Sequence, residues 1–107
     1  MASKTKELID ILDEMVTLLK QDQESHWSAW MESSKRRLLN SDYSGVEHLL
    51  NAYGGMGSFN DLIIGQQMID GKFKWKDGAA KSNDKLARLR SSAYDIANYI
   101  KQNHEIG

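Results

Sequence analysis

The stretch TKELIDILDEMVTLLKQ, residues 5–21, decides the fold class of this 107-residue chain. Apolar side chains recur in it every three or four residues, which is the spacing of one face of an α-helix. They are Leu8, Ile11, Leu12, Met15 and Leu19. Acidic side chains occupy the opposite face, at Glu7, Asp10, Asp13 and Glu14. The stretch is therefore predicted to form an amphipathic helix whose apolar face packs on a core.

The same periodicity predicts three further helices along the chain. A second helix is expected over residues 24–39, with Trp27, Trp30, Met31 and Leu38 in its apolar stripe. A short third helix is expected over residues 44–53 and ends at Gly54, because glycine favours the left-handed conformation that follows many helices. The last helix runs to about Asn103, with Ser82, Asn83 or Asp84 as its N-cap.

Residues 65–81 lack helical periodicity and leave two structures open. Asp70-Gly71 is a strong two-residue hairpin signal, and Phe73 and Trp75 alternate with lysines as in a strand. An ordered loop is nevertheless favoured, because an isolated two-stranded hairpin is only marginally stable. The expected fold is all-α, a single domain over residues 1–107. It is predicted to be a compact bundle of about four to five helices, with a short hairpin as the alternative between residues 65 and 81.

Composition narrows the class of protein. Apolar residues make up 40% and charged residues 27% of the chain, which is ordinary globular usage. It has no cysteine for a disulfide or a thiolate zinc site, and no apolar run approaches the roughly 20 residues of a membrane helix. The N-terminus leads into an amphipathic pattern rather than an apolar signal core. A cytoplasmic domain without membrane contact is expected.

The charge is distributed unevenly along the chain. Residues 1–65 hold 6 basic and 10 acidic residues, a net charge of −4, whereas residues 66–107 hold 8 basic and 5 acidic residues, a net charge of +3. The sum of −1 argues against general binding to nucleic acid or membranes. The acidic and the basic part of the chain either steer a charged partner or simply complement each other within the fold.

The glycine-rich segment at residues 54–58 invites comparison with a phosphate-binding loop. A P-loop follows a strand and ends in Gly-Lys-Ser/Thr, whereas this segment follows a predicted helix and has no lysine before Ser58. Residues 54–61 are therefore predicted to be a scaffold turn. Gly54 should have a positive φ, and Ser58 should cap the next helical turn with Asp61 folded back toward it.

No constellation of residues predicts catalysis or metal binding. His26, His48 and His104 fall on three different elements without the spacing that brings ligands together on one helix. The carboxylates of the first helix lie on a solvated face, whereas a catalytic carboxylate needs burial or a close like charge. The chain is expected to be no enzyme and to use no cofactor.

Trp75 differs from the other tryptophans because it lies between Lys74 and Lys76 in the irregular segment. An exposed aromatic side chain among lysines can anchor a protein partner or stack on bases. It can equally fold back over the bundle, with its flanking lysines reaching into solvent.

The run LLNAYGGMGSFNDL, residues 49–62, resembles the signature of a family of small bacterial helical domains of unknown function. The spacing of Trp27 and Trp30, and the later Asn83-x-x-Leu86-x-x-Leu89, are similar to that family as well. Such domains resemble immunity proteins, the cytoplasmic partners of toxin domains in contact-dependent growth inhibition. The resemblance implies a binding protein and brings no catalytic residues with it.

The leading hypothesis is an immunity protein that binds and blocks a cognate toxin domain, most naturally a nuclease, whose phosphate-binding site is basic. The partner-binding candidates are Glu7, Asp10, Asp13, Glu14 and Trp75, with Glu24 and Glu32 as an extension. The alternative is a homo-oligomeric or adaptor domain that pairs through its last helix. A third hypothesis is a small nucleic-acid binder that uses Lys72, Lys74, Trp75, Lys76 and Lys81.

Overall fold

Four α-helices form the body of the molecule across residues 3–54 and 58–103, the parts of the chain that the computed structural model describes. They are α1 (Ser3–Gln21), α2 (Ser25–Leu39), α3 (Ser44–Leu50) and α4 (Ala79–Asn103). A 3₁₀ turn, η1 (Phe59–Asp61), and an antiparallel hairpin of β1 (Gln66–Ile69) and β2 (Lys72–Trp75) connect α3 to α4. The predicted helical bundle is confirmed, with the hairpin as an addition.

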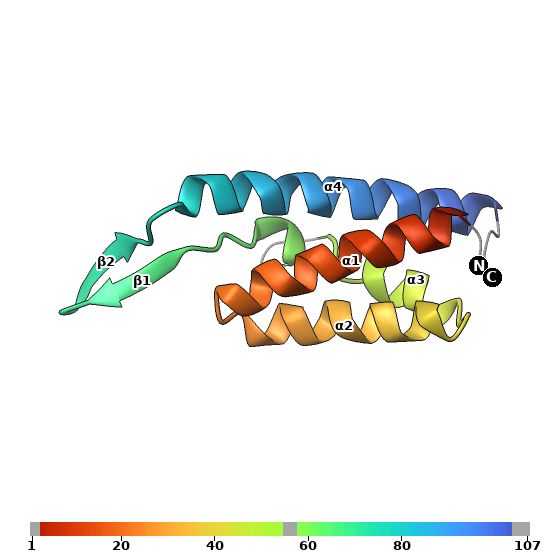
Figure 1. Cartoon of the computed structure of the whole chain (residues 1–107), viewed down its shortest axis with the longest axis horizontal. Helices are drawn as coiled ribbons and strands as arrows, with labels where there is room; N and C mark the ends of the chain where they lie inside the picture. Colours follow the sequence, from red (N-terminus) through yellow and green to blue (C-terminus); the bar gives the residue numbers. More distant parts are fainter. Residues whose placement is uncertain (1–2, 55–57, 104–107) are drawn as a thin grey trace.

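Helix α1 lies at the centre of the bundle, between α2 on one side and α4 on the other (Figure 1). Its predicted apolar residues are buried, except that Ile11 is only partly so. Ile9, Val16 and Leu18 are also buried, which the single-face prediction did not include. The wider buried surface follows from contact with two helices, since each one covers its own stripe.

Helix α3 crosses α2 at very short range because its second residue is a glycine. A β-carbon on Gly45 would lie 2.8 Å from the carbonyl oxygen of Ser34 and 2.9 Å from Cγ of Leu38. The helix begins beside Asp42, whose Oδ1 accepts a hydrogen bond of 2.9 Å from the Ser44 backbone N–H. That bond and the Ser44 hydroxyl hold the pKa of the Asp42 carboxyl below its ordinary value.

Two predicted helix ends are wrong by about one turn. Helix α3 ends at Leu50 rather than Tyr53, and residues 51–53 form a tighter turn in which Tyr53 N–H donates to the Leu50 carbonyl at 3.1 Å. Helix α4 begins at Ala79, so Ser82, Asn83 and Asp84 lie inside it rather than at its N-cap. Asn83 instead uses its side chain to bind the backbone of Ile64.

The molecule is elongated, with principal extents of 50 × 24 × 20 Å. The hairpin projects past one end of the helices, whereas α4 runs along almost the whole bundle (Figure 1). Within the described parts of the chain, no helix combines the length and the apolar character that crossing a bilayer requires.

Candidate functional site

The hairpin is the most distinctive surface feature of the molecule, and we refer to residues 66–75 as the β-arm. Its turn is Asp70-Gly71, with φ values of 54° and 76°. Two successive positive φ values define a type I′ turn, whose twist matches that of paired strands. The loop favoured from the sequence is therefore wrong, and the hairpin that the Asp-Gly signal predicted is correct.

The register of the β-arm separates its side chains into two faces. Across the ladder, Gln66 pairs with Trp75, Gln67 with Lys74, Met68 with Phe73, and Ile69 with Lys72. Direct partners share a face, as do residues two apart along one strand. We call the face of Gln66, Met68, Phe73 and Trp75 the apolar face, and that of Gln67, Ile69, Lys72 and Lys74 the cationic face.

The apolar face is open to solvent, although it carries three large apolar side chains. Met68 is 67% exposed, Phe73 50% and Trp75 52%. The rings of Phe73 and Trp75 pack edge to face, with their centroids 5.2 Å apart. A contiguous apolar surface of this kind marks an interaction site more often than a monomer surface, especially where polar residues surround it. Trp75 thus does not fold back over the bundle.

Asp22, just after α1, holds the base of the β-arm in place. Its Oδ1 accepts a hydrogen bond of 2.9 Å from the Gly65 backbone N–H and another of 3.2 Å from Lys76 Nζ. The strands are closed at this end by the Lys76 N–H, which donates to the Gly65 carbonyl at 2.7 Å. This carboxylate, whose side chain is only 16% exposed, therefore fixes the base of the arm to the end of α1.

Helix α4 holds the same junction from the other side. The Asn83 amide accepts from the Ile64 N–H at 2.9 Å and donates to the Ile64 carbonyl at 2.8 Å. Gly65 has φ +84°, and a β-carbon there would lie 2.6 Å from Cβ of Ala79. Only glycine satisfies both the backbone conformation and this contact. The direction of the arm is consequently set by the start of α4.

Two open hollows flank the base of the arm. One, of about 720 Å³, lies where β2 meets α4 and is lined by Trp75, Lys76, Asn83 and residues 77–81. The other, of about 290 Å³, lies beside the start of β1 and is lined by Trp27, Ser58, Asp61, Leu62, Ile63 and Gln66. Ile63 is exposed there, so apolar surface continues from the arm onto the bundle.

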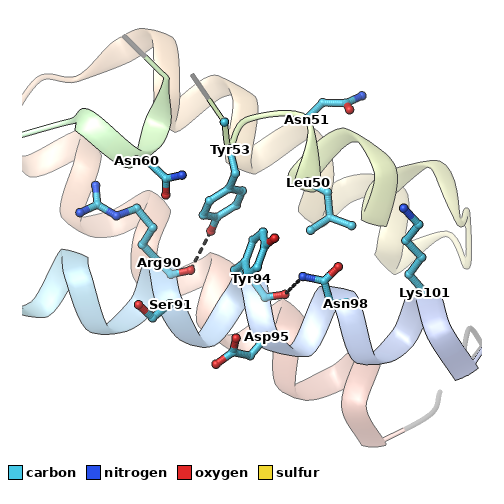
Figure 2. Close-up of a pocket in the computed structure, with 11 residues that line it drawn as sticks. Leu50, Asn51, Tyr53, Asn60, Arg90, Ser91, Tyr94, Asp95, Asn98 and Lys101 are labelled. Carbon is cyan, nitrogen blue, oxygen red and sulfur yellow. Dashed lines mark hydrogen bonds between the residues drawn. The ribbon is translucent and has the colours of Figure 1, made fainter. Parts of the chain in front are cut away.

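A separate cleft of about 570 Å³ lies between α3 and α4. Figure 2 shows the rings of Tyr53 and Tyr94 inside it, with Asn98 and Lys101 further along α4. Its polar groups largely serve the fold: the Tyr53 hydroxyl donates to the Arg90 carbonyl at 2.8 Å (Figure 2), and Arg90 Nη1 donates to the carbonyls of Phe59 and Leu62. Burial raises the pKa of the Tyr53 phenol, which makes it a hydrogen-bond donor rather than a base.

The acidic residues predicted as binding residues do not converge with Trp75. Glu7, Asp10, Asp13 and Glu14 are exposed on the N-terminal and central part of α1, whereas the β-arm projects past the other end of that helix (Figure 1). Two of the four make ion pairs within the chain, since Glu7 lies 3.4 Å from Lys4 and Asp13 lies 3.0 Å from Lys35. Of the proposed extension, Glu32 pairs with Lys20 at 3.3 Å, and Glu24 directly precedes α2.

Two histidines belong to an aromatic cluster rather than to a reactive site. His48 stacks on Trp30 with centroids 4.3 Å apart, and Trp30 Nε1 donates to the His48 carbonyl at 2.8 Å. His26 packs on the edge of Trp27 at 4.7 Å. Burial lowers the pKa of His48, and the Arg37 charge lowers it further. His104 lies outside the described residues.

Two features predicted for the glycine-rich turn are confirmed, the positive φ of Gly54 and the Ser58 cap, although Gly54 lies beyond the end of α3 at Leu50. Gly54 has φ +110°, and Ser58 is the N-cap of η1, with its hydroxyl oxygen accepting from the Asn60 N–H at 3.3 Å. The Asp61 N–H donates to the Ser58 carbonyl at 3.0 Å as part of the backbone of η1, whereas the folding back of the Asp61 side chain stays a prediction. Gly55, Met56 and Gly57 lie outside the described residues. Among the residues that are described, no group of three or more His, Asp or Glu side chains could hold a metal ion.

The sequence proposed Trp75 as a candidate binding residue but neither Phe73 nor Met68, which lie directly opposite each other. The signal was present, because a two-residue Asp-Gly turn fixes the register of the strands on either side. Counting outward from that turn places Met68 on the face of Phe73 and Trp75.

Comparison with known proteins adds one finding. No curated protein and no solved structure matches this chain. Residues 20–72, from the end of α1 through α2, α3, η1 and β1 to the first residue of β2, match a domain of unknown function (DUF6966).

Proposed function

We propose that this protein is a non-enzymatic binding protein that recognises a protein partner through the β-arm. The observation that carries the proposal is the apolar face, in which Met68, Phe73 and Trp75 are at least half exposed on a fixed structure. Aromatic side chains contribute a large share of binding energy at protein interfaces. Because the arm is anchored by Asp22 and Asn83, little ordering would oppose binding.

The register favours a protein partner over single-stranded nucleic acid. A base-stacking site needs aromatic rings and phosphate-binding cations on one surface. Trp75 and Phe73 lie on the apolar face, whereas Lys72 and Lys74 lie on the opposite face. Lys76 is already paired with Asp22.

The partner that we propose is a bacterial toxin domain, which the chain would neutralise in the cytoplasm as an immunity protein. The support is the resemblance of residues 49–62 to small helical domains of that kind. The exposed carboxylates of α1 would steer or cover a basic toxin surface, such as a nuclease site, through Asp10 and Glu14 in particular.

Co-expression tests this proposal. The chain should co-purify with the product of the adjacent reading frame and relieve its toxicity. Trp75→Ala and Phe73→Ser should abolish both effects, whereas Tyr99→Ser, at an aromatic site 44% exposed near the end of α4, should not. Failure of the wild-type chain to bind or to protect would refute the toxin assignment.

Self-association is the alternative that the same apolar face supports. Light scattering across a concentration series separates the two functions, because a homo-oligomer forms from the chain alone. A monomer at high concentration removes this alternative.

A further inference from the structure

We propose that the β-arm receives an extended strand of its partner along the free edge of β1, and that this strand alternates apolar and acidic side chains. The inference rests on the proposed function in that it specifies how the partner is held. It concerns the chemistry of the arm, however, and can be tested without the toxin.

The β-arm is a sheet that lacks a third strand. Among the described residues, β1 pairs with β2 and with nothing else, and no other element lies along the arm in Figure 1. Two isolated strands are only marginally stable in water, and a third strand or a packed helix is what gives such a sheet independent stability. Adding a strand of the partner to an exposed edge is a common mode of peptide recognition.

The backbone of β1 presents its free groups at defined residues. Lys76 N–H bonds to the Gly65 carbonyl, so Gly65 and Lys76 continue the ladder at a hydrogen-bonded position, although the Gly65 N–H itself bonds to Asp22. Such pairs alternate with non-bonded ones in antiparallel strands. Gln67 and Ile69 therefore face β2, whereas the N–H and C=O groups of Gln66 and Met68 point outward.

The two edges of the arm differ in how well they are protected. Strand β2 carries lysines at positions 72 and 74, and Lys76 follows it. Natural edge strands use lysine to prevent pairing with a strand of another chain. The sequence of β1, Gln-Gln-Met-Ile, contains no charge and no proline. The hollow lined by Trp27, Leu62 and Ile63 adjoins the start of β1 and would receive the apolar end of an added strand.

Charge decides the chemistry of that strand. Side chains of a third strand would alternate between the apolar face, beside Met68, and the cationic face, beside Gln67 and Ile69. On the cationic face, Lys72 and Lys74 lie one strand further away, about 10 Å between strand backbones, so only long side chains of opposite charge can meet them. Apolar residues of the added strand therefore suit the apolar face, and acidic residues suit the cationic face. A second copy of the arm suits the edge of β1 less well, because pairing β1 with β1 would place four lysines on one face of the sheet.

Peptide titration of the full-length protein, followed by NMR, tests the inference. The probe is a synthetic peptide of about eight residues, a usual strand length, that alternates valine and glutamate. A matched peptide replaces glutamate with lysine. The glutamate peptide should slow hydrogen exchange at the outward amides of Gln66 and Met68, and the lysine peptide should not.

A pair of variants separates the backbone of β1 from its side chains. Met68→Pro and Met68→Ala both remove the thioether, but only proline removes the outward N–H. Met68→Pro should bind the glutamate peptide roughly tenfold more weakly than Met68→Ala, the factor for about one lost hydrogen bond. Unchanged resonances for Gly65 and Lys76 would show that the hairpin persists in both.

Four results would overturn the inference: no binding of the glutamate peptide, equal binding of the two peptides, equal affinity of the two Met68 variants, or protection of Phe73 and Trp75 amides instead. A concentration-dependent dimer that Met68→Pro abolishes would assign the edge to a second copy and would overturn it as well. Peptide binding without toxin neutralisation would retain the strand-binding edge and reject the toxin, so the two failures can be told apart.

Discussion

Gly45 and Gly54 are both required by the structure, but for different physical reasons. An alanine at Gly45 would place its β-carbon against the backbone of α2, which cannot move aside, whereas Gly54 has open space around it and a φ of +110°. We expect Gly45→Ala to lower the free energy of unfolding by about 1–3 kcal/mol through overpacking. Gly54→Ala should cost about 1 kcal/mol through backbone strain. Urea denaturation measures both; a neutral Gly45→Ala would contradict the close crossing of α2 and α3.

His48 should make stability depend on pH. Its pKa lies below the ordinary value of 6.5 in the folded state, so the unfolded chain takes up the proton first as the pH falls. The free energy of unfolding should therefore be fully retained above pH 6.5, decrease as the pH drops below it, and level off below the folded pKa. Denaturation curves across this range measure the slope. His48→Gln should reduce it, and an identical slope in the variant would assign the effect to other groups.

At the scale of elements, the attachment of the β-arm depends on Asp22. Asp22→Ala removes the acceptor for both Gly65 and Lys76 and should cost about 1–3 kcal/mol, because it leaves the buried Gly65 N–H unsatisfied. Asp22→Asn should cost less, since an amide oxygen can still accept from Gly65. Hydrogen exchange should accelerate at Gly65 and Lys76 while α2 remains protected. Asp13→Asn, which breaks the exposed pair with Lys35, is the matched control and should cost below about 1 kcal/mol.

The helices were predictable from sequence because each one shows its own apolar period. The hairpin was visible in Asp70-Gly71, yet the preference for a loop was wrong because its stabilising contacts are distant in sequence. Gly65 bonds to Asp22 and Ile64 to Asn83, and no local pattern reveals either pair. For the same reason Asn83 resembled a helix cap although it bridges two segments. Trp75 was identified by its lysine neighbours, whereas the separation of the α1 acids from it required the fold.

On the scale of the whole molecule, the β-arm should be separable from the bundle. Gly65 and Lys76 are already joined by a hydrogen bond of 2.7 Å, so replacing residues 66–75 with Asn-Gly should close the chain without moving α4. The variant should keep its helical circular dichroism, with the free energy of unfolding changed by about 1 kcal/mol or less, since an isolated hairpin adds little stability. Binding of the partner should be lost. Unfolding of the shortened chain would show instead that the arm supports the core.

The attachment of the arm through Gly65 and Lys76 also bears on how this protein can diversify. Mutations that change Met68, Phe73 or Trp75 leave the buried core untouched, because these side chains are at least half exposed and none of them belongs to the core cluster. A lineage can therefore alter what the arm recognises while it inherits the bundle unchanged. A single-residue insertion in β1 is the exception, because it would move the side chains of that strand to the opposite face of the sheet. Such an insertion should abolish partner recognition rather than alter which partner is preferred.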